Sequence, residues 1–152
     1  MVFGSLRKGH KFENVIAKWL SKKTNVQWQR VLSSGGYGTI HDINSFRGDV
    51  FTEANLYANL VIECKDHNKH VNLQDFNNPK SDLNQWITQT KTEAKERPWL
   101  LFLHWNRSPI FIVAANADVV NYVTQTALKP ILEACMPVCN TSEYAFLQVK
   151  EE

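Results

Sequence analysis

Two carboxylates and a lysine stand where the pattern of a core-forming strand would not place charges. Asp49 opens a short apolar run directly after Gly48, and Glu63 and Lys65 end the next apolar run with Cys64 between them. Side chains alternate along a strand, so Glu63 and Lys65 share one face and Cys64 takes the other. Carboxylate oxygens bind a hard divalent cation such as Mg²⁺, and an adjacent ammonium group can stabilise charge on a phosphate oxygen. The pattern predicts a metal-dependent nuclease site.

The Gly-Asp and Glu-x-Lys motifs are more informative together than either is alone. Glu-x-Lys alone is usually an exposed ion pair, which contributes little to stability. A Gly-Asp pair, then thirteen residues, then Glu-x-Lys at the end of an apolar run is much rarer. Asp42 is a rival for the first carboxylate. We prefer Asp49 because a strand is expected to follow it at once.

The charge is concentrated near the N-terminus, although the net charge is only +2. Residues 1–30 hold seven bases and one acid, Glu13, whereas the rest of the chain holds ten bases and fourteen acids. A basic segment beside an acidic remainder favours a polyanionic partner that meets one face. Glu13 follows the apolar position Phe12 on the predicted first helix, so it can lie at the core edge and add a carboxylate to the site.

Length and composition favour a single nuclease domain over residues 1–152. A chain of this length, with 43% hydrophobic residues, can bury a core of its own. No apolar run approaches the length of a membrane helix, and the N-terminus lacks the apolar core of a secretory signal. Three cysteines are too few for a disulfide scaffold and favour a reducing compartment. We expect a cytoplasmic protein of a bacterial, archaeal or phage-infected cell, with no membrane partner.

Hydrophobic periodicity predicts an α/β protein with a central mixed β-sheet flanked by helices. Helices are expected over residues 7–22, 82–97, 117–128 and 131–135. Strands are expected over residues 26–32, 49–52, 56–64, 100–105, 110–115 and 144–149. A hairpin turn at residues 53–55 would bring Asp49 beside the end of the third strand. Residues 33–47 would form a long polar loop, and such loops are commonly functional.

Two parts of the chain resemble known nuclease signatures. Residues 48–49 and 61–65 (Gly-Asp … Val-Ile-Glu-Cys-Lys) resemble the signature of the PD-(D/E)XK nuclease superfamily. Residues 7–13 (Arg-Lys-Gly-His-Lys-Phe-Glu) resemble the opening R-K-G-x-x-x-E of archaeal-type Holliday junction resolvases. The resemblance covers roughly residues 7–115.

The chain also departs from that family. Gly48 stands in place of the usual proline, and residues 33–49 make a longer segment than in the compact resolvases. Residues 116–152 lie outside the resemblance.

The resemblance implies a restriction-endonuclease-like core and a Mg²⁺-dependent DNA endonuclease, with Mn²⁺ able to substitute. Such an enzyme would act as a homodimer in DNA recombination and repair, resolving four-way (Holliday) junctions by paired phosphodiester hydrolysis. The expected metal ligands are Asp49, Glu63 and Glu13. The expected catalytic residues are Glu13, Asp49, Glu63, Lys65 and Ser34. The expected DNA-binding residues are Arg7, Lys8, Lys11, Ser33 and Arg47.

Other functions stay open at this point. A sequence-specific restriction or homing endonuclease would use the same metal site, but it also needs side chains that contact the edges of the DNA bases. The candidates for that role are Asn72, Gln74, Asn77 and Asn78, together with the long loop. A non-catalytic DNA-binding module would be favoured if catalytic residues were replaced. All four candidate residues are present, namely Glu13, Asp49, Glu63 and Lys65. A zinc site is a further alternative, with Cys64, His67 and His70 at short spacing, although the paired C-x-x-C knuckles of such sites are missing from the sequence.

Overall fold

The computed structural model describes residues 2–32 and 48–151, with side chains from residue 9 onward. Its strands are β1 (Trp28–Arg30), β2 (Val50–Thr52), β3 (Val61–His67), β4 (Trp99–Trp105), β5 (Phe111–Ala115), β6 (Cys135–Asn140) and β7 (Tyr144–Val149). Its helices are α1 (Val2–Thr24), α3 (Asp82–Ala94), α4 (Asn116–Val120) and α5 (Tyr122–Glu133), with short 3₁₀ helices η1 (Asn55–Tyr57) and η2 (Leu73–Asn77). Within the described residues, the strands form one seven-stranded sheet in the order β1-β2-β3-β4-β5-β7-β6.

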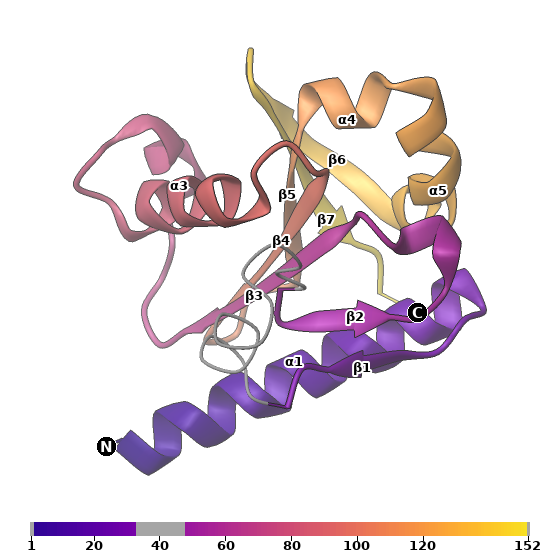
Figure 1. Ribbon diagram of the computed structural model, residues 1–152. Coiled ribbons are helices and arrows are strands. Elements are labelled where there is room, and N and C mark those ends of the chain that lie inside the picture. Colours follow the sequence, from indigo (N-terminus) through magenta and orange to yellow (C-terminus); the bar gives the residue numbers. More distant parts are fainter. Residues whose placement is uncertain (1, 33–47, 152) are drawn as a thin grey trace.

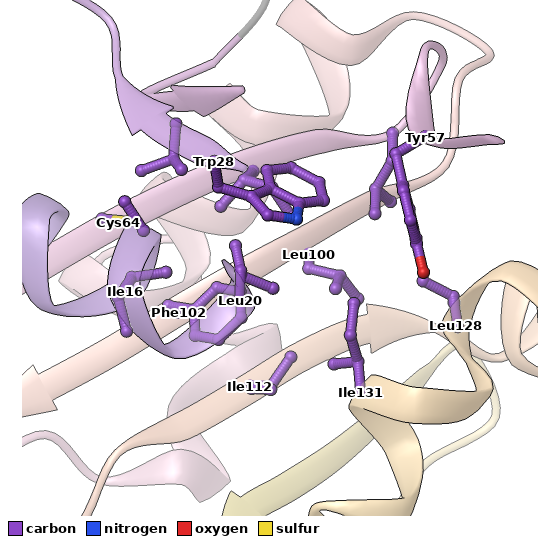
Figure 2. Close-up of a cluster of buried hydrophobic side chains, with 14 of the residues drawn as sticks. Ile16, Leu20, Trp28, Tyr57, Cys64, Leu100, Phe102, Ile112, Leu128 and Ile131 are labelled. Carbon is purple, nitrogen blue, oxygen red and sulfur yellow. The ribbon is translucent and has the colours of Figure 1, made fainter. Parts of the chain in front are cut away.

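Helices cover both faces of this sheet (Figure 1). On one face, Ile16 and Leu20 of α1 and Leu128 and Ile131 of α5 belong to a single buried cluster with the central strands (Figure 2). On the other face, α3 packs against the sheet through residues such as Ile87. The prediction of an α/β protein with a mixed sheet flanked by helices is therefore confirmed.

The first helix forms because apolar residues recur at helical spacing. Phe12, Ile16 and Leu20 lie four residues apart and are all buried, which makes one continuous stripe against the sheet. The hydroxyl of Thr24, the last residue of α1, donates to the carbonyl of Leu20 at 2.7 Å and accepts the indole N–H of Trp28 at 2.8 Å. This contact ties the end of α1 to β1.

The two neighbours of β3 run in opposite directions. β2 pairs with it antiparallel, with Val50 opposite Ile62, and β4 pairs with it parallel, with Leu101 opposite Glu63. The parallel pairing needs a crossover connection, and α3 lies within it. Because side chains alternate, Ile62 and Cys64 enter the core under α1. Glu63 turns toward the face that α3 covers.

The boundaries of the strand that carries Glu63 differ from the prediction. The predicted strand over 56–64 is wrong in its first half, because residues 55–57 form η1 with Leu56 exposed. β3 begins only at Val61 and continues beyond Lys65 to His67. The connection from β2 is therefore longer than the predicted three-residue turn, although the antiparallel pairing is as expected.

The helices and the C-terminal region also differ in detail. α3 ends at Ala94 instead of residue 97, because Lys95 takes a left-handed conformation with φ of 60°. α5 runs through Pro130 to Glu133, so the separate helix predicted over 131–135 is wrong. The following strand, β6, was missed, because only the first of its six residues is buried and no alternating apolar pattern marks it.

In the described part of the chain, no helix combines the length and the apolar character needed to cross a lipid bilayer. The assignment of residues 1–152 to one nuclease domain stays a prediction.

Candidate active site

Asp49 immediately precedes β2 and is held there by backbone hydrogen bonds to both neighbouring segments. Its N–H donates to the carbonyl of Ile62 in β3 at 2.7 Å, and its carbonyl accepts the N–H of Val31, just after β1, at 2.9 Å. Its carboxylate oxygen Oδ2 accepts the backbone N–H of Cys64 at 2.9 Å. The carboxylate is therefore fixed beside the residue that separates Glu63 from Lys65.

Gly48 allows this close approach to β3. The residue has a φ of +80°, which L side chains rarely adopt, and a Cβ there would collide with the carbonyl oxygen of Ile62. Glycine at this position is therefore required by the backbone geometry that seats Asp49. The proline that the superfamily signature usually has here could not take this φ either.

Glu63 is one of the few charged side chains buried in the described residues, with 4% of its surface exposed. Burial is the main reason that its pKa rises from 4.5 to about 9, and the negative charges of Asp49 and Glu93 and a hydrogen bond with Asp49 raise it further. Lys65, two residues along the same face and half-buried, opposes this rise. Oxygen Oε1 of Glu63 has no hydrogen-bond partner within the described ranges.

Glu13 reaches the same region from α1. It is 7% exposed, and burial followed by the charge of Asp49 raises its pKa from 4.5 to about 7, against the charges of Arg30 and Lys65. Arg30, the last residue of β1, lies with Nε 3.9 Å from Oε2 of Glu13. At that separation the two groups attract each other but do not form a hydrogen bond, and neither atom has a hydrogen-bond partner in the described part of the chain.

Asp49 links the carboxylates electrostatically. Burial raises its pKa above 3.8, and Glu93 of α3 adds to the rise, whereas the Cys64 N–H and the Lys65 charge oppose it. Asp49 also raises the pKa of both Glu13 and Glu63. Folding thus brings together the four residues predicted from the sequence, with Glu13 arriving from the α1 face and Glu63 from the α3 face.

Other predicted residues are placed less completely. Lys11 is exposed on α1. Arg7 and Lys8 belong to α1, but their side chains lie outside the described residues. The whole of Ser33, Ser34, Asp42 and Arg47 also lies outside the described residues.

Sequence reasoning missed two charged residues of this region, Arg30 and Glu93. Arg30 lies inside the strand predicted over residues 26–32, and nothing in its sequence surroundings pairs it with Glu13 on the first helix. Glu93 is an ordinary-looking acid in the last turn of α3. Nothing in its sequence surroundings distinguishes it from a solvated helix position, because only the crossover connection brings α3 over β3.

The chemistry of the carboxylates fits a hard divalent cation. Asp49 and Glu63 offer oxygen ligands, and the buried Glu63 oxygen without a partner is the kind of group that a cation would satisfy. Among the described residues, no group of three His, Cys, Asp or Glu side chains is arranged to hold a metal. Mg²⁺ commonly needs only one or two carboxylates together with waters and substrate phosphate, so this finding is compatible with Mg²⁺ and gives the zinc alternative no support.

Comparison with known proteins agrees with this geometry. The profile of the family described as "Phage putative PDDEXK endonuclease" matches residues 4–144. Protein D14 of Escherichia phage T5 is 30% identical over 110 residues, which are 67% of this chain and 66% of that protein, just under two thirds of its length. No solved structure gives a significant match. The family match spans nearly the whole chain, including all four candidate residues, and the chain belongs to the phage PD-(D/E)XK endonuclease family.

Proposed function

We propose that this protein is a Mg²⁺-dependent DNA endonuclease whose active site consists of Asp49, Glu63, Lys65 and Glu13. The observation that carries the proposal is the close placement of the half-buried Asp49 carboxylate and the buried Glu63, whose Oε1 has no hydrogen-bond partner among the described residues. The pKa values of both groups are raised. A buried carboxylate with a second carboxylate beside it disfavours the folded state, and such arrangements concentrate at functional sites. Membership of an endonuclease family supports the same conclusion.

Each residue has a role that follows from its position. Asp49 and Glu63 would hold the cation, and Glu13 would support it from the α1 side. The bound cation would polarise the scissile phosphate and favour deprotonation of the attacking water. Lys65, on the same face of β3 as Glu63, would orient that water or stabilise the negative charge that develops on the phosphate. The water oxygen bonds to phosphorus, one P–O ester bond breaks, and the water proton passes to solvent or to the leaving alkoxide.

The finer proposal concerns the substrate. The R-K-G-x-x-x-E resemblance at residues 7–13 and the excess of bases over residues 1–30 support a branched DNA, with the four-way junction as the specific substrate. A junction has two strands to cut symmetrically, so a homodimer would present one active site to each strand. Ser33 or Ser34 would contact the scissile phosphate, and Arg7, Lys8, Lys11 and Arg47 would contact the DNA backbone.

The test is a cleavage assay with Mg²⁺ on a synthetic four-way junction and on linear duplexes built from its arms. Asp49→Asn serves as the inactive control. Paired symmetric nicks in the junction alone are the expected result. Cleavage of a linear duplex at one site, with the junction left intact, would instead favour a restriction or homing endonuclease. Tight DNA binding without any cleavage by the wild type would indicate a non-catalytic DNA-binding module.

A further inference from the structure

α1 has a second flank, opposite to the one that carries Glu13 toward Arg30. There, an open cleft of about 580 Å³ lies between Lys11 and Phe12 of α1, the ends of β3 and β4, and the β4–β5 turn. Phe12 and Glu13 are consecutive, so this cleft and the candidate active site flank the same turn of the helix. A volume of this size is within the range of sites that accept a small molecule or one nucleotide unit.

A histidine and an aspartate form a hydrogen-bonded pair at the edge of this cleft. Nδ1 of His104, on β4, lies 2.8 Å from Oδ1 of Asp66, on β3, and the two residues are directly opposite in the parallel register. The Asp66 side chain is 8% exposed and that of His104 is 30% exposed. The imidazole ring stacks on Phe12 with 5.7 Å between the ring centroids. Ring orientation is therefore fixed from two sides.

This arrangement decides which atom faces a ligand. A carboxylate can only accept, so Nδ1 donates to Asp66, and the other ring nitrogen, Nε2, is left for the cleft. A phosphate oxygen at Nε2 would place the imidazole between two negative groups. An imidazole ring with an N–H on both nitrogens donates one hydrogen bond to each of them.

Two carboxylates, Asp66 and Glu151, also line the cleft, so an anion is favoured only on the α1 side, near Lys11. Lys11 is exposed there and lines the cleft together with His104. Lys150 and Glu151 also line it and carry opposite charges, and the Lys150 ammonium donates to the carbonyl of Glu133 at 3.2 Å. Lys11 and His104 are therefore the lining residues that we assign to a phosphate.

We propose that this cleft binds a phosphate of the DNA strand that the active site cuts, at a nucleotide removed from the scissile bond. The proposal rests on the proposed function, because it takes the ligand to be that DNA. Because the cleft and Glu13 flank the same turn of α1, a strand bound at the active site can continue along α1 to His104. The DNA strand would then be bound at two points, the active site and the cleft, on either side of one turn of α1.

The experiment measures affinity for a labelled duplex by fluorescence anisotropy in EDTA, so that cleavage does not interfere. His104→Ala and Lys11→Gln are each expected to weaken binding about tenfold, since each removes a charge-assisted phosphate contact. The slope of log affinity against log salt concentration should also fall by about one for Lys11→Gln. The matched control is Lys129→Gln, because Lys129 is also an exposed lysine, on α5, and does not line this cleft. It should leave both quantities unchanged.

Thermal melting of each variant distinguishes loss of a contact from loss of the fold. Asp66→Asn offers a second variant of the His104–Asp66 pair, and it keeps the size of the side chain. An NMR titration of the His104 ring signals, first with a short oligonucleotide and then with inorganic phosphate at the same concentration, identifies the ligand. Shifts with the oligonucleotide alone are expected. Equal response to free phosphate would overturn the assignment to DNA, and wild-type affinity in folded His104→Ala would overturn the site itself. Cleavage of the same duplex and of a four-way junction by the wild type with Mg²⁺ is scored separately, so failure of the nuclease proposal is distinguishable from failure of this one.

Discussion

The backbone N–H of Cys64 donates to Oδ2 of Asp49 at 2.9 Å, and this contact joins the Asp49 carboxylate to the strand that carries Glu63 and Lys65. Cys64 lies between Glu63 and Lys65, and its own side chain is buried on the opposite face of the sheet. The hydrogen bond therefore sets the distance of the Asp49 carboxylate from both functional neighbours. It also explains why Asp49 can be brought close to Glu63 although both carry acidic groups.

Replacement of Asp49 by asparagine should separate catalysis from folding and binding. The amide oxygen of asparagine can still accept the Cys64 N–H, so the local structure should persist, whereas the charge that would hold the cation is lost. Cleavage should fall by about a thousandfold or more, consistent with the several kcal/mol that a bound metal contributes. DNA affinity measured in EDTA should stay at the wild-type value, because it rests on the basic surface. Cleavage at the wild-type rate would show that Asp49 is not a ligand.

The metal-free protein should lose stability as the pH rises. The pKa of Glu13 is raised from 4.5 to about 7 and that of Glu63 from 4.5 to about 9, so the folded state binds protons more tightly than the unfolded chain. The stabilisation is complete below about pH 4.5 and is lost between pH 4.5 and pH 9. Melting temperatures in EDTA should therefore fall across this range. Mg²⁺ added at pH 8 should raise the melting temperature, since it neutralises the same charges.

Glu63→Gln should be more stable than the wild type in the absence of metal, although it should not cleave DNA. Glutamine keeps the shape of the side chain and removes the acidic group that folding has to neutralise. At pH 8 in EDTA the variant should melt at a higher temperature, and the dependence on pH above 7 should flatten. Thermal denaturation followed by circular dichroism checks both. A variant less stable than the wild type at pH 8 would contradict the view that the burial of Glu63 lowers the stability of the metal-free protein.

Gly48→Ala should destabilise the protein and abolish cleavage. An added Cβ would collide with the Ile62 carbonyl, and the positive φ is unfavourable for alanine, so the chain has to move at the residue next to Asp49. Gly9→Ala is the matched control. Gly9 lies within α1 with nothing near the position of a Cβ, so alanine there should stabilise the helix by about 0.5–1 kcal/mol. Urea denaturation of the two variants should give changes of opposite sign.

The sequence predicted the parts of the fold that depend on local periodicity. The stripe of Phe12, Ile16 and Leu20 marked α1, and a continuous apolar run marked β4 as a strand. Such a run is typical of a strand that is buried on both faces of the sheet. β6 escaped prediction because an exposed edge strand is defined by its pairing with β7 and not by its own pattern. Lys95 shows the same limit at a helix end, since lysine gives no sign of a left-handed φ.

The residues of the candidate site also differ in whether local sequence rules could predict them. Asp49, Glu63 and Lys65 could be grouped from spacing, because strand alternation and antiparallel pairing are local rules. Arg30 and Glu93 could not, because they approach the carboxylates from an edge strand and from a helix on the other face. Their positions depend on how whole elements pack, and only the tertiary structure supplies that.

Arg30 provides the last prediction. Its charge lowers the pKa of Glu13, which burial and Asp49 otherwise raise to about 7. Removing that charge in Arg30→Gln should raise the Glu13 pKa further, so that Glu13 is protonated over more of the neutral range. If ionised Glu13 supports catalysis, the acid side of the pH–rate profile should move to higher pH, with the rate recovering as the pH approaches 9. Arg30→Lys keeps the charge and should shift the profile less, and Glu13→Gln should remove this titration from the profile altogether. A purely structural role for Arg30 would lower the rate equally at every pH, and that outcome would contradict the electrostatic link between the two residues.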